Sequence, residues 1–173
     1  EGEPLAAELL HLDRELEVRG EHRRQVDDRP RPAGEVPGEP EDEQSRYLEV
    51  LIESPRPIRV ASIYLPNGNP RPSEKYDYKL RWLDRINERS KTLLAHEESV
   101  VLSGDCNCIP RDEDCWDPKA WAEDALAWHD TRERFRKLQW MGYTDAFMAR
   151  DGRIQKYTFW DYQAGAWQKN WGI

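Results

Sequence analysis

The 173-residue sequence lacks the apolar runs that membrane proteins need. No stretch approaches the roughly 18 consecutive apolar residues that a transmembrane helix requires. The first residues also lack the basic-then-apolar order of a secretory signal peptide. These absences predict a soluble protein of the cytoplasm.

Cysteine is also scarce, since the chain has only three. They lie in one short stretch, at Cys106, Cys108 and Cys115, and an odd number in one stretch does not make a disulfide framework. A zinc site built from these thiols would lack a fourth ligand at a recognisable spacing. We therefore expect reduced thiols that pack in the core.

The first quarter of the chain lacks core-forming residues: residues 1–44 contain no Phe, Tyr, Trp, Ile or Lys. These residues carry the whole net charge of −8, because the acidic and basic residues of 45–173 balance. Leucine spacing predicts a short charged helix over 5–18, and the prolines of 28–40 predict a linker or disordered tract. The neutral remainder would have to meet a polyanion through a local basic patch or a metal ion.

Beyond this leader the pattern switches to strands and helices. Two β-prone runs, 47–52 and 58–65, flank a short proline-containing segment and predict an antiparallel pair. Ser73 is placed to cap a helix over 74–96. The apolar face of that helix is traced by Tyr76, Leu80, Leu83, Ile86 or Asn87, and Leu94.

The second half of the chain predicts shorter elements. We expect a helix over 119–127, a second helix over 130–140 that stops at Gly142, and a strand over 156–160. The acidic segment 112–118 lacks the glycine and the closing glutamate of a calcium-binding loop. It is therefore expected to be a solvated loop.

The run Val100–Pro110 predicts a buried strand that delivers Asp105 and Asn107 to its carboxyl end. The ends of such strands are where α/β sheets place their ligands. On an extended segment the two side chains would share one face, with Cys106 on the other. A carboxylate and a carboxamide there can hold a water, a phosphate oxygen or a hard cation. A strand end with Asp and Asn as turn formers is the equal alternative.

Four short blocks follow one another along the chain: Ile63–Gly68, Gly104–Asn107 with Ile109 and Pro110, Gly142–Phe147, and Tyr157–Tyr162. Their order and spacing resemble bacterial exodeoxyribonuclease III, of the endonuclease/exonuclease/phosphatase superfamily, over about residues 37–173. The resemblance implies a four-layer α/β sandwich of two packed mixed sheets flanked by helices, incomplete at both ends of this sequence. It leaves residues 1–36 as an unassigned acidic, proline-rich leader, either disordered or translated in the wrong frame, and 37–173 as a partial domain.

The same resemblance implies metal-dependent hydrolysis of DNA phosphodiesters. The expected activities are 3′-to-5′ exodeoxyribonuclease and abasic-site endonuclease in DNA repair, with Mg²⁺ or Mn²⁺ as cofactor. The expected partner is double-stranded DNA with 3′ ends or abasic sites. The protein is expected to be a monomer and to have no membrane partner. Two alternatives remain open: a superfamily phosphoesterase that acts on a lipid or inositol phosphate, and a catalytically inactive DNA-binding fragment.

Site residues follow from the matched blocks. Asp105 resembles the aspartate that orients or deprotonates the attacking water and is a weak candidate for a metal ligand. Asn107 resembles the residue that steadies the scissile phosphate, and Tyr64 resembles the tyrosine whose hydroxyl lies against it. The expected substrate-binding residues are Phe159 and Trp160, which match the aromatic wall of an abasic-sugar pocket, and Asn170 near the phosphate. Core packing is the alternative for Tyr64 and for the two aromatic residues.

Some residues of the family pattern are missing from the sequence. Nothing in residues 1–36 resembles the main metal-binding glutamate or the early asparagine, and the Arg-Ile-Asp block and later Asp-His pair do not occur. We therefore expect the 173-residue polypeptide by itself to have little or no nuclease activity and marginal stability.

Overall fold

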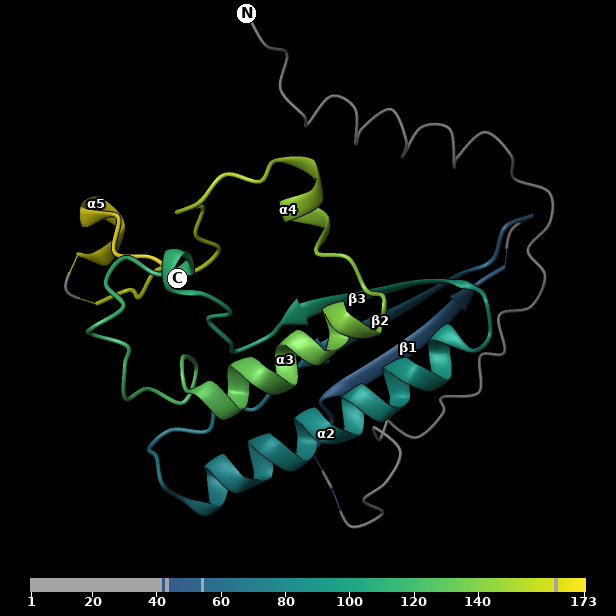
Figure 1. Cartoon of the computed structure of the whole chain (residues 1–173), viewed down its shortest axis with the longest axis horizontal. Coiled ribbons are helices and arrows are strands. Elements are labelled where there is room, and N and C mark those ends of the chain that lie inside the picture. Colours follow the sequence, from purple (N-terminus) through teal and green to yellow (C-terminus); the bar gives the residue numbers. More distant parts are fainter. Residues whose placement is uncertain (1–41, 43, 54, 164) are drawn as a thin grey trace, which may run out of the picture. The chain divides into compact units, whose positions relative to one another are not determined.

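The computed structural model describes residues 42, 44–53, 55–163 and 165–173 (Figure 1). The leader, residues 1–36, and the helix expected over 5–18 lie outside the described residues.

The described strands form one three-stranded sheet in the order β1-β2-β3. β1 (Tyr47–Ile52) pairs with β2 (Ile58–Tyr64) in antiparallel orientation, and β2 pairs with β3 (Ser99–Asp105) in parallel orientation. The antiparallel pair expected from the sequence is thus confirmed. β3 can pair with β2 in parallel because the chain crosses over between them through a helix.

The crossover helix α2 (Glu74–Leu94) covers one face of this sheet. It begins as expected at Ser73, whose Oγ accepts a hydrogen bond from the Tyr76 backbone N–H at 3.3 Å. The core between α2 and the sheet consists of alternate strand residues and one stripe of the helix: Tyr47, Ala61, Ile63, Leu65, Trp82, Leu83 and Ile86.

The buried face of α2 differs from the one that hydrophobicity predicted. Tyr76, Leu83, Ile86 and Asn87 are buried as expected. Leu80 and Leu94 are only half-buried, whereas Lys79 and Ser90, which were not expected on this face, are buried. The reason is that α2 packs against both the sheet and a second helix, so a polar stripe beside the apolar one is also covered. For example, Asn87 Nδ2 donates to the backbone oxygen of Arg134 on that second helix at 3.0 Å.

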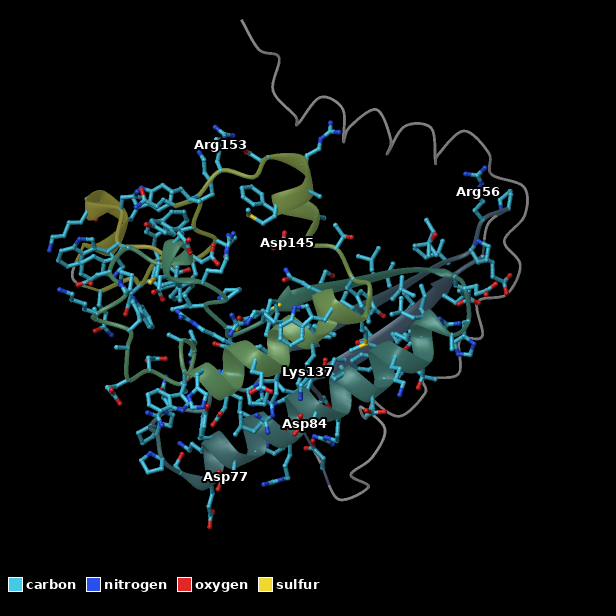
Figure 2. All side chains as sticks on the ribbon, in the orientation of Figure 1. Arg56, Asp77, Asp84, Lys137, Asp145 and Arg153 are labelled. Carbon is cyan, nitrogen blue, oxygen red and sulfur yellow. The ribbon has the colours of Figure 1, made fainter. Side chains whose placement is uncertain are left out.

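The second helix, α3 (His129–Met141), lies beside α2 on the same side of the sheet (Figure 1). It ends at Gly142, at a positive φ of 124°, as the sequence predicts. A salt bridge of 3.0 Å between Arg134 and Asp84 links the two helices. Figure 2 shows Asp84 and Lys137 along the seam between them.

Two expected elements do not form. Residues 119–127 make consecutive turns instead of a helix, and the side chains of Asp117 and Asp124 accept hydrogen bonds from the backbone N–H groups two residues ahead. Such local bonds compete with helix formation. The strand expected over 156–160 is reduced to a single bridge between Trp160 and Gly172.

The remaining segments are short. They comprise the 3₁₀ helix η1 (Asp112–Asp114), α4 (Ala146–Arg150) and α5 (Ala166–Lys169). A second small core, formed by Ile109, Cys115, Leu126 and Ala127, underlies this part of the chain. None of the helices in the described part is long and apolar enough to cross a membrane.

All three cysteines are free thiols. Cys106 packs against the main core and Cys115 belongs to the second one. Burial raises the pKa of Cys106 to about 11 and that of Cys108 to about 12. These thiols are therefore protonated and unreactive near neutral pH.

The face of the sheet opposite α2 is open. On β1 the outward side chains Leu48, Val50 and Ile52 are 60%, 49% and 51% exposed, and Val101 on β3 is 45% exposed. The expectation of a buried strand is therefore wrong for β3, where five of the seven residues are exposed. The described residues supply helices for one face only and a single sheet, so they form a mixed α/β arrangement without a second sheet.

Candidate functional site

Two predicted site residues lie side by side where β2 and β3 end. Tyr64 is the last residue of β2 and pairs in register with Asp105, the last residue of β3. Neighbours in register on parallel strands point to the same face, here the open one. Tyr64 is 53% exposed and Asp105 is exposed as well. We call Tyr64, Asp105 and Asn107 the strand-end site.

Glycine before Asp105 permits this close pairing. Gly104 has a φ of +133°, and a Cβ added to it would lie 2.0 Å from the backbone oxygen of Ile63 on β2. Any other residue would push the two strand ends apart. The glycine of the Gly-Asp-Cys-Asn block therefore has a steric role beside the site.

Asn107 joins the site by turning back. The strand ends at Asp105 and Asn107 has a φ of 37°, so the simple alternation expected from the sequence does not extend to it. Its side-chain Nδ2 donates to the Leu65 backbone oxygen at 2.8 Å and to Asp105 Oδ2 at 3.2 Å, while its backbone N–H donates to Asp105 Oδ1 at 2.9 Å. Asn107 thus orients both oxygens of the Asp105 carboxylate.

Two residues that were not predicted as site residues, Asn67 and Arg46, contact the strand-end site. Asn67 Nδ2 donates to Asn107 Oδ1 at 3.3 Å. The guanidinium of Arg46 lies 4.8 Å from the centre of the Tyr64 ring, a cation–π distance, and also donates to the Tyr64 backbone oxygen at 3.2 Å. Asn67 lies within a quoted block and could have been found there, whereas no motif marks Arg46.

The predicted substrate-binding residues lie near the C-terminus. Phe159 is 51% exposed and lines a pocket of about 200 Å³. We call this the aromatic pocket; its other lining residues include Trp116, Trp121, Trp171 and Ile173. The rings of Trp116 and Trp171 stack at 4.6 Å.

Trp160 and Asn170 lie beside this pocket but do not line it. Trp160 Nε1 donates to Asn170 Oδ1 at 3.3 Å, and the Trp160 ring meets Trp167 edge-on at 4.6 Å. In this arrangement they support the segment that carries Phe159.

The loop after Asn107 connects the strand-end site to the aromatic pocket. Its Ile109 N–H bonds to the Leu126 oxygen at 2.9 Å, and its Trp116 N–H bonds to the Gly172 oxygen at 3.0 Å. The C-terminal segment is held in turn by bonds between Ile173 and Phe159, both at 3.0 Å. Backbone hydrogen bonds therefore hold the loop after Asn107 against the C-terminal segment that contributes Phe159 to the aromatic pocket.

Few side chains near the strand-end site could act as ligands for a metal ion. Among the described residues, no group of three or more His, Cys, Asp or Glu side chains is placed to hold one. Asp105 provides one oriented, exposed carboxylate, which suits a single oxygen ligand of a hard cation. One carboxylate alone does not form a metal site.

Comparisons with known proteins agree with this arrangement, although no protein-family model matches the chain. The chain is 29% identical over 136 residues to an exodeoxyribonuclease of Bacillus subtilis, which covers 78% of this chain and 52% of that protein. An AP endonuclease from Archaeoglobus fulgidus superposes with a TM-score of 0.71 at 30% identity and covers 79% of this chain and 52% of its own.

A third similar protein is a 3′ phosphatase from Neisseria whose structure was solved with a product DNA hairpin. It superposes with a TM-score of 0.72 at 29% identity, over 78% of this chain and 51% of its own. The chain spans about half the length of each of these three proteins. The similarities confirm the resemblance drawn from the four blocks, because the similar proteins are named as an exodeoxyribonuclease and an AP endonuclease.

Proposed function

We propose that the strand-end site is part of a phosphodiesterase site that acts on DNA. The observation that carries this proposal is the single bonded group formed by Asp105 and Asn107, with Tyr64 in register beside it. The names of the similar proteins, an exodeoxyribonuclease, an AP endonuclease and a 3′ phosphatase bound to product DNA, support DNA as the substrate.

Asp105 is the group suited to hold and deprotonate the attacking water. Two N–H groups of Asn107 fix its carboxylate, and its exposure leaves lone pairs for a water. Both hydrogens of Asn107 Nδ2 are already engaged, so a bound phosphate would have to exchange one of these bonds. Tyr64 lies in register with Asp105 on the exposed face, and its hydroxyl would donate to a phosphate oxygen.

The aromatic pocket is the proposed site for an abasic sugar. Four of its eight lining residues are Trp or Phe, and one of them, Phe159, belongs to the segment matched by the fourth block. Rings favour the apolar face of a sugar that has lost its base, while a confined volume opposes an intact nucleotide.

We further propose a requirement for Mg²⁺ or Mn²⁺, which in phosphoryl chemistry neutralises charge on the phosphate oxygens. Asp105 would supply one ligand. EDTA should abolish any hydrolysis that the protein carries out, and restored metal should recover it.

A second sheet is proposed for the open face of β1 to β3. Leu48, Val50, Ile52 and Val101 form a row of apolar side chains on that face, and sheets bury such faces against another layer. The four-layer sandwich implied by the resemblance would cover them.

Binding to DNA is the first test, because it does not require a complete catalytic set. Fluorescence anisotropy would compare a duplex containing an abasic-site analogue with the intact duplex of the same sequence. The wild type should prefer the abasic duplex, and Phe159→Ala should weaken that binding by about 10-fold, the effect of losing one aromatic contact to a nucleotide. Trp140→Ala, at a residue of α3 that is 72% exposed, is the matched control.

Hydrolysis is tested on a panel that separates the alternatives. The panel holds duplexes with a 3′ hydroxyl, a 3′ phosphate or an abasic site, together with an inositol phosphate. The proposal expects any activity to fall on DNA and to disappear in Asp105→Asn. Cleavage of the inositol phosphate without cleavage of DNA would reject it, and binding of abasic DNA without cleavage in either metal would favour a binding role.

A further inference from the structure

Lys79 of α2 is fully buried, with 0% of its surface exposed. Its Nζ donates to three backbone oxygens: Asn67 at 2.9 Å, Asn107 at 2.7 Å and Ala125 at 3.1 Å. An ammonium group has three N–H donors, so these carbonyls use all of them. The side chain is therefore fully satisfied inside the protein.

The three carbonyls come from three separate segments. Asn67 follows β2, Asn107 follows β3, and Ala125 precedes α3. Gly68 makes room for the lysine, since a Cβ there would lie 2.7 Å from Lys79 Cδ. One ammonium group thus fixes the relative positions of three backbone segments that lie beyond the ends of the paired strands.

Two short steps lead from this ammonium to the Asp105 carboxylate. Lys79 holds the backbones of Asn67 and Asn107, whose side chains meet at 3.3 Å. Asn107 then donates to both oxygens of Asp105, at 2.9 and 3.2 Å. A shift in the backbone of Asn107 would therefore turn the carboxylate.

We propose that Lys79 is a positioning residue of the strand-end site, whose ammonium holds the Asn107 backbone so that Asn107 orients the Asp105 carboxylate. The inference rests on the proposed phosphodiesterase function of that site. It adds a residue that lies outside all four sequence blocks.

The energetic cost of a buried charge supports a specific role. Burial lowers the pKa of Lys79 to about 8, even though Cys108, Asp124 and Asp105 act in the opposite direction. Removing an ammonium from water is energetically unfavourable, and an apolar residue of similar volume would fill the same space without that cost. In return, Lys79 holds three backbone carbonyl groups in place. An apolar residue would leave these carbonyls without hydrogen-bond donors.

The test compares three variants by amide hydrogen exchange in NMR spectra. Lys79→Met keeps the length of the stem and removes the charge and all donors, whereas Lys79→Arg keeps both. Lys75→Met, at an exposed position of the same helix, is the control. The reporters are the backbone N–H of Asn107, which bonds to Asp105, and the backbone N–H of Leu83 in the buried stripe of α2.

Lys79→Met should speed exchange at Asn107 by about 10-fold more than at Leu83, as expected for the loss of a charge-assisted bond near one residue. It should also shift the side-chain amide signals of Asn107. Lys79→Arg should restore most of the protection, and Lys75→Met should change neither reporter. Equal acceleration at both reporters, or none at Asn107, would overturn the proposal, because the first result indicates a purely structural role.

If Lys79→Met does not fold, Lys79→Gln takes its place and is judged by the same ratio. These measurements need no DNA, so they remain decisive when the wild type fails to bind an abasic duplex and the proposed function falls. When the wild type does bind, Lys79→Met should weaken binding by about 10-fold and Lys75→Met should not.

Discussion

Glu49 is the residue on which the helix-facing side of β1 depends. Its side chain, 11% exposed, forms salt bridges with Arg59 on β2 and Arg89 on α2, both at 2.7 Å, and accepts a hydrogen bond from the Tyr47 hydroxyl. Burial acts to raise the pKa of Glu49, but the bonds from Arg89, Tyr47 and Arg59 outweigh it and lower the pKa below the ordinary value of 4.5. One carboxylate thus ties a strand to its neighbour and to the covering helix.

We predict that Glu49→Gln lowers the free energy of unfolding by about 2 kcal/mol at pH 7, because it leaves two partly buried guanidinium groups without their counter-charge. Since the folded pKa is lowered, this stabilisation is fully present above the unfolded pKa and is lost as the pH falls through the folded one. The difference between wild type and variant should therefore shrink below about pH 4.5.

Urea unfolding at several pH values measures this difference. Glu88→Gln, at an exposed position of α2, is the control and should change stability by less than about 0.5 kcal/mol. A wild-type advantage that stays constant down to pH 3 would contradict the assignment.

At the scale of elements, the junction of β2 and β3 depends on Gly104. Two glycines with similar φ angles allow its steric role to be separated from the strain of a positive φ: Gly104 has a φ of +133° and Gly142 has a φ of +124°. A Cβ on Gly142 would meet only Leu94 Cδ1, at 3.9 Å, whereas on Gly104 it would collide with the Ile63 backbone oxygen.

Gly142→Ala should therefore cost about 1–2 kcal/mol of stability from strain alone. Gly104→Ala should cost about 2 kcal/mol more, because the strand must also move. Thermal and urea unfolding of the two variants give the comparison. Equal losses would mean that the β2–β3 spacing does not constrain this position.

The elements that the sequence predicted well are those with a long periodic pattern. The helix after Ser73, the antiparallel pair and the helix that stops at Gly142 all form within a few residues of their expected bounds. The segments 119–127 and 156–160 did not, because their conformation depends on side-chain bonds and on pairing with the last residues of the chain. Such partners cannot be recognised from local periodicity.

The residues of the strand-end site also differ in whether a local sequence pattern could predict them. Short blocks led to the prediction of Asp105, Asn107 and Tyr64 as site residues, and the structure brings these three residues together. Lys79 was not found, since a lysine on an amphipathic helix is normally assigned to the solvated face. Its burial depends on three carbonyls that converge only after folding.

At the scale of the whole described molecule, the sheet is covered on one face only. The outward residues Leu48, Val50, Ile58 and Val101, which come from all three strands, are between 38% and 60% exposed. Contiguous apolar surface of this kind commonly marks an interface or an aggregation site. The strand-end site lies on this same open face, since Tyr64 and Asp105 point outward with these residues.

We predict that the triple variant Leu48→Thr, Val50→Thr and Ile52→Thr reduces binding of a hydrophobic dye and self-association by at least about half, because it removes the apolar row of β1. Threonine retains a high strand propensity, so Tm should fall by no more than a few degrees. The control is Ile63→Thr on the covered face, where the side chain is 5% exposed and the substitution should destabilise the fold by about 2 kcal/mol or more. Dye fluorescence and sedimentation measure the first effect and thermal melting the second. If the triple variant melts as early as Ile63→Thr, the outward residues of β1 take part in a core, and the open face would have to be assigned differently.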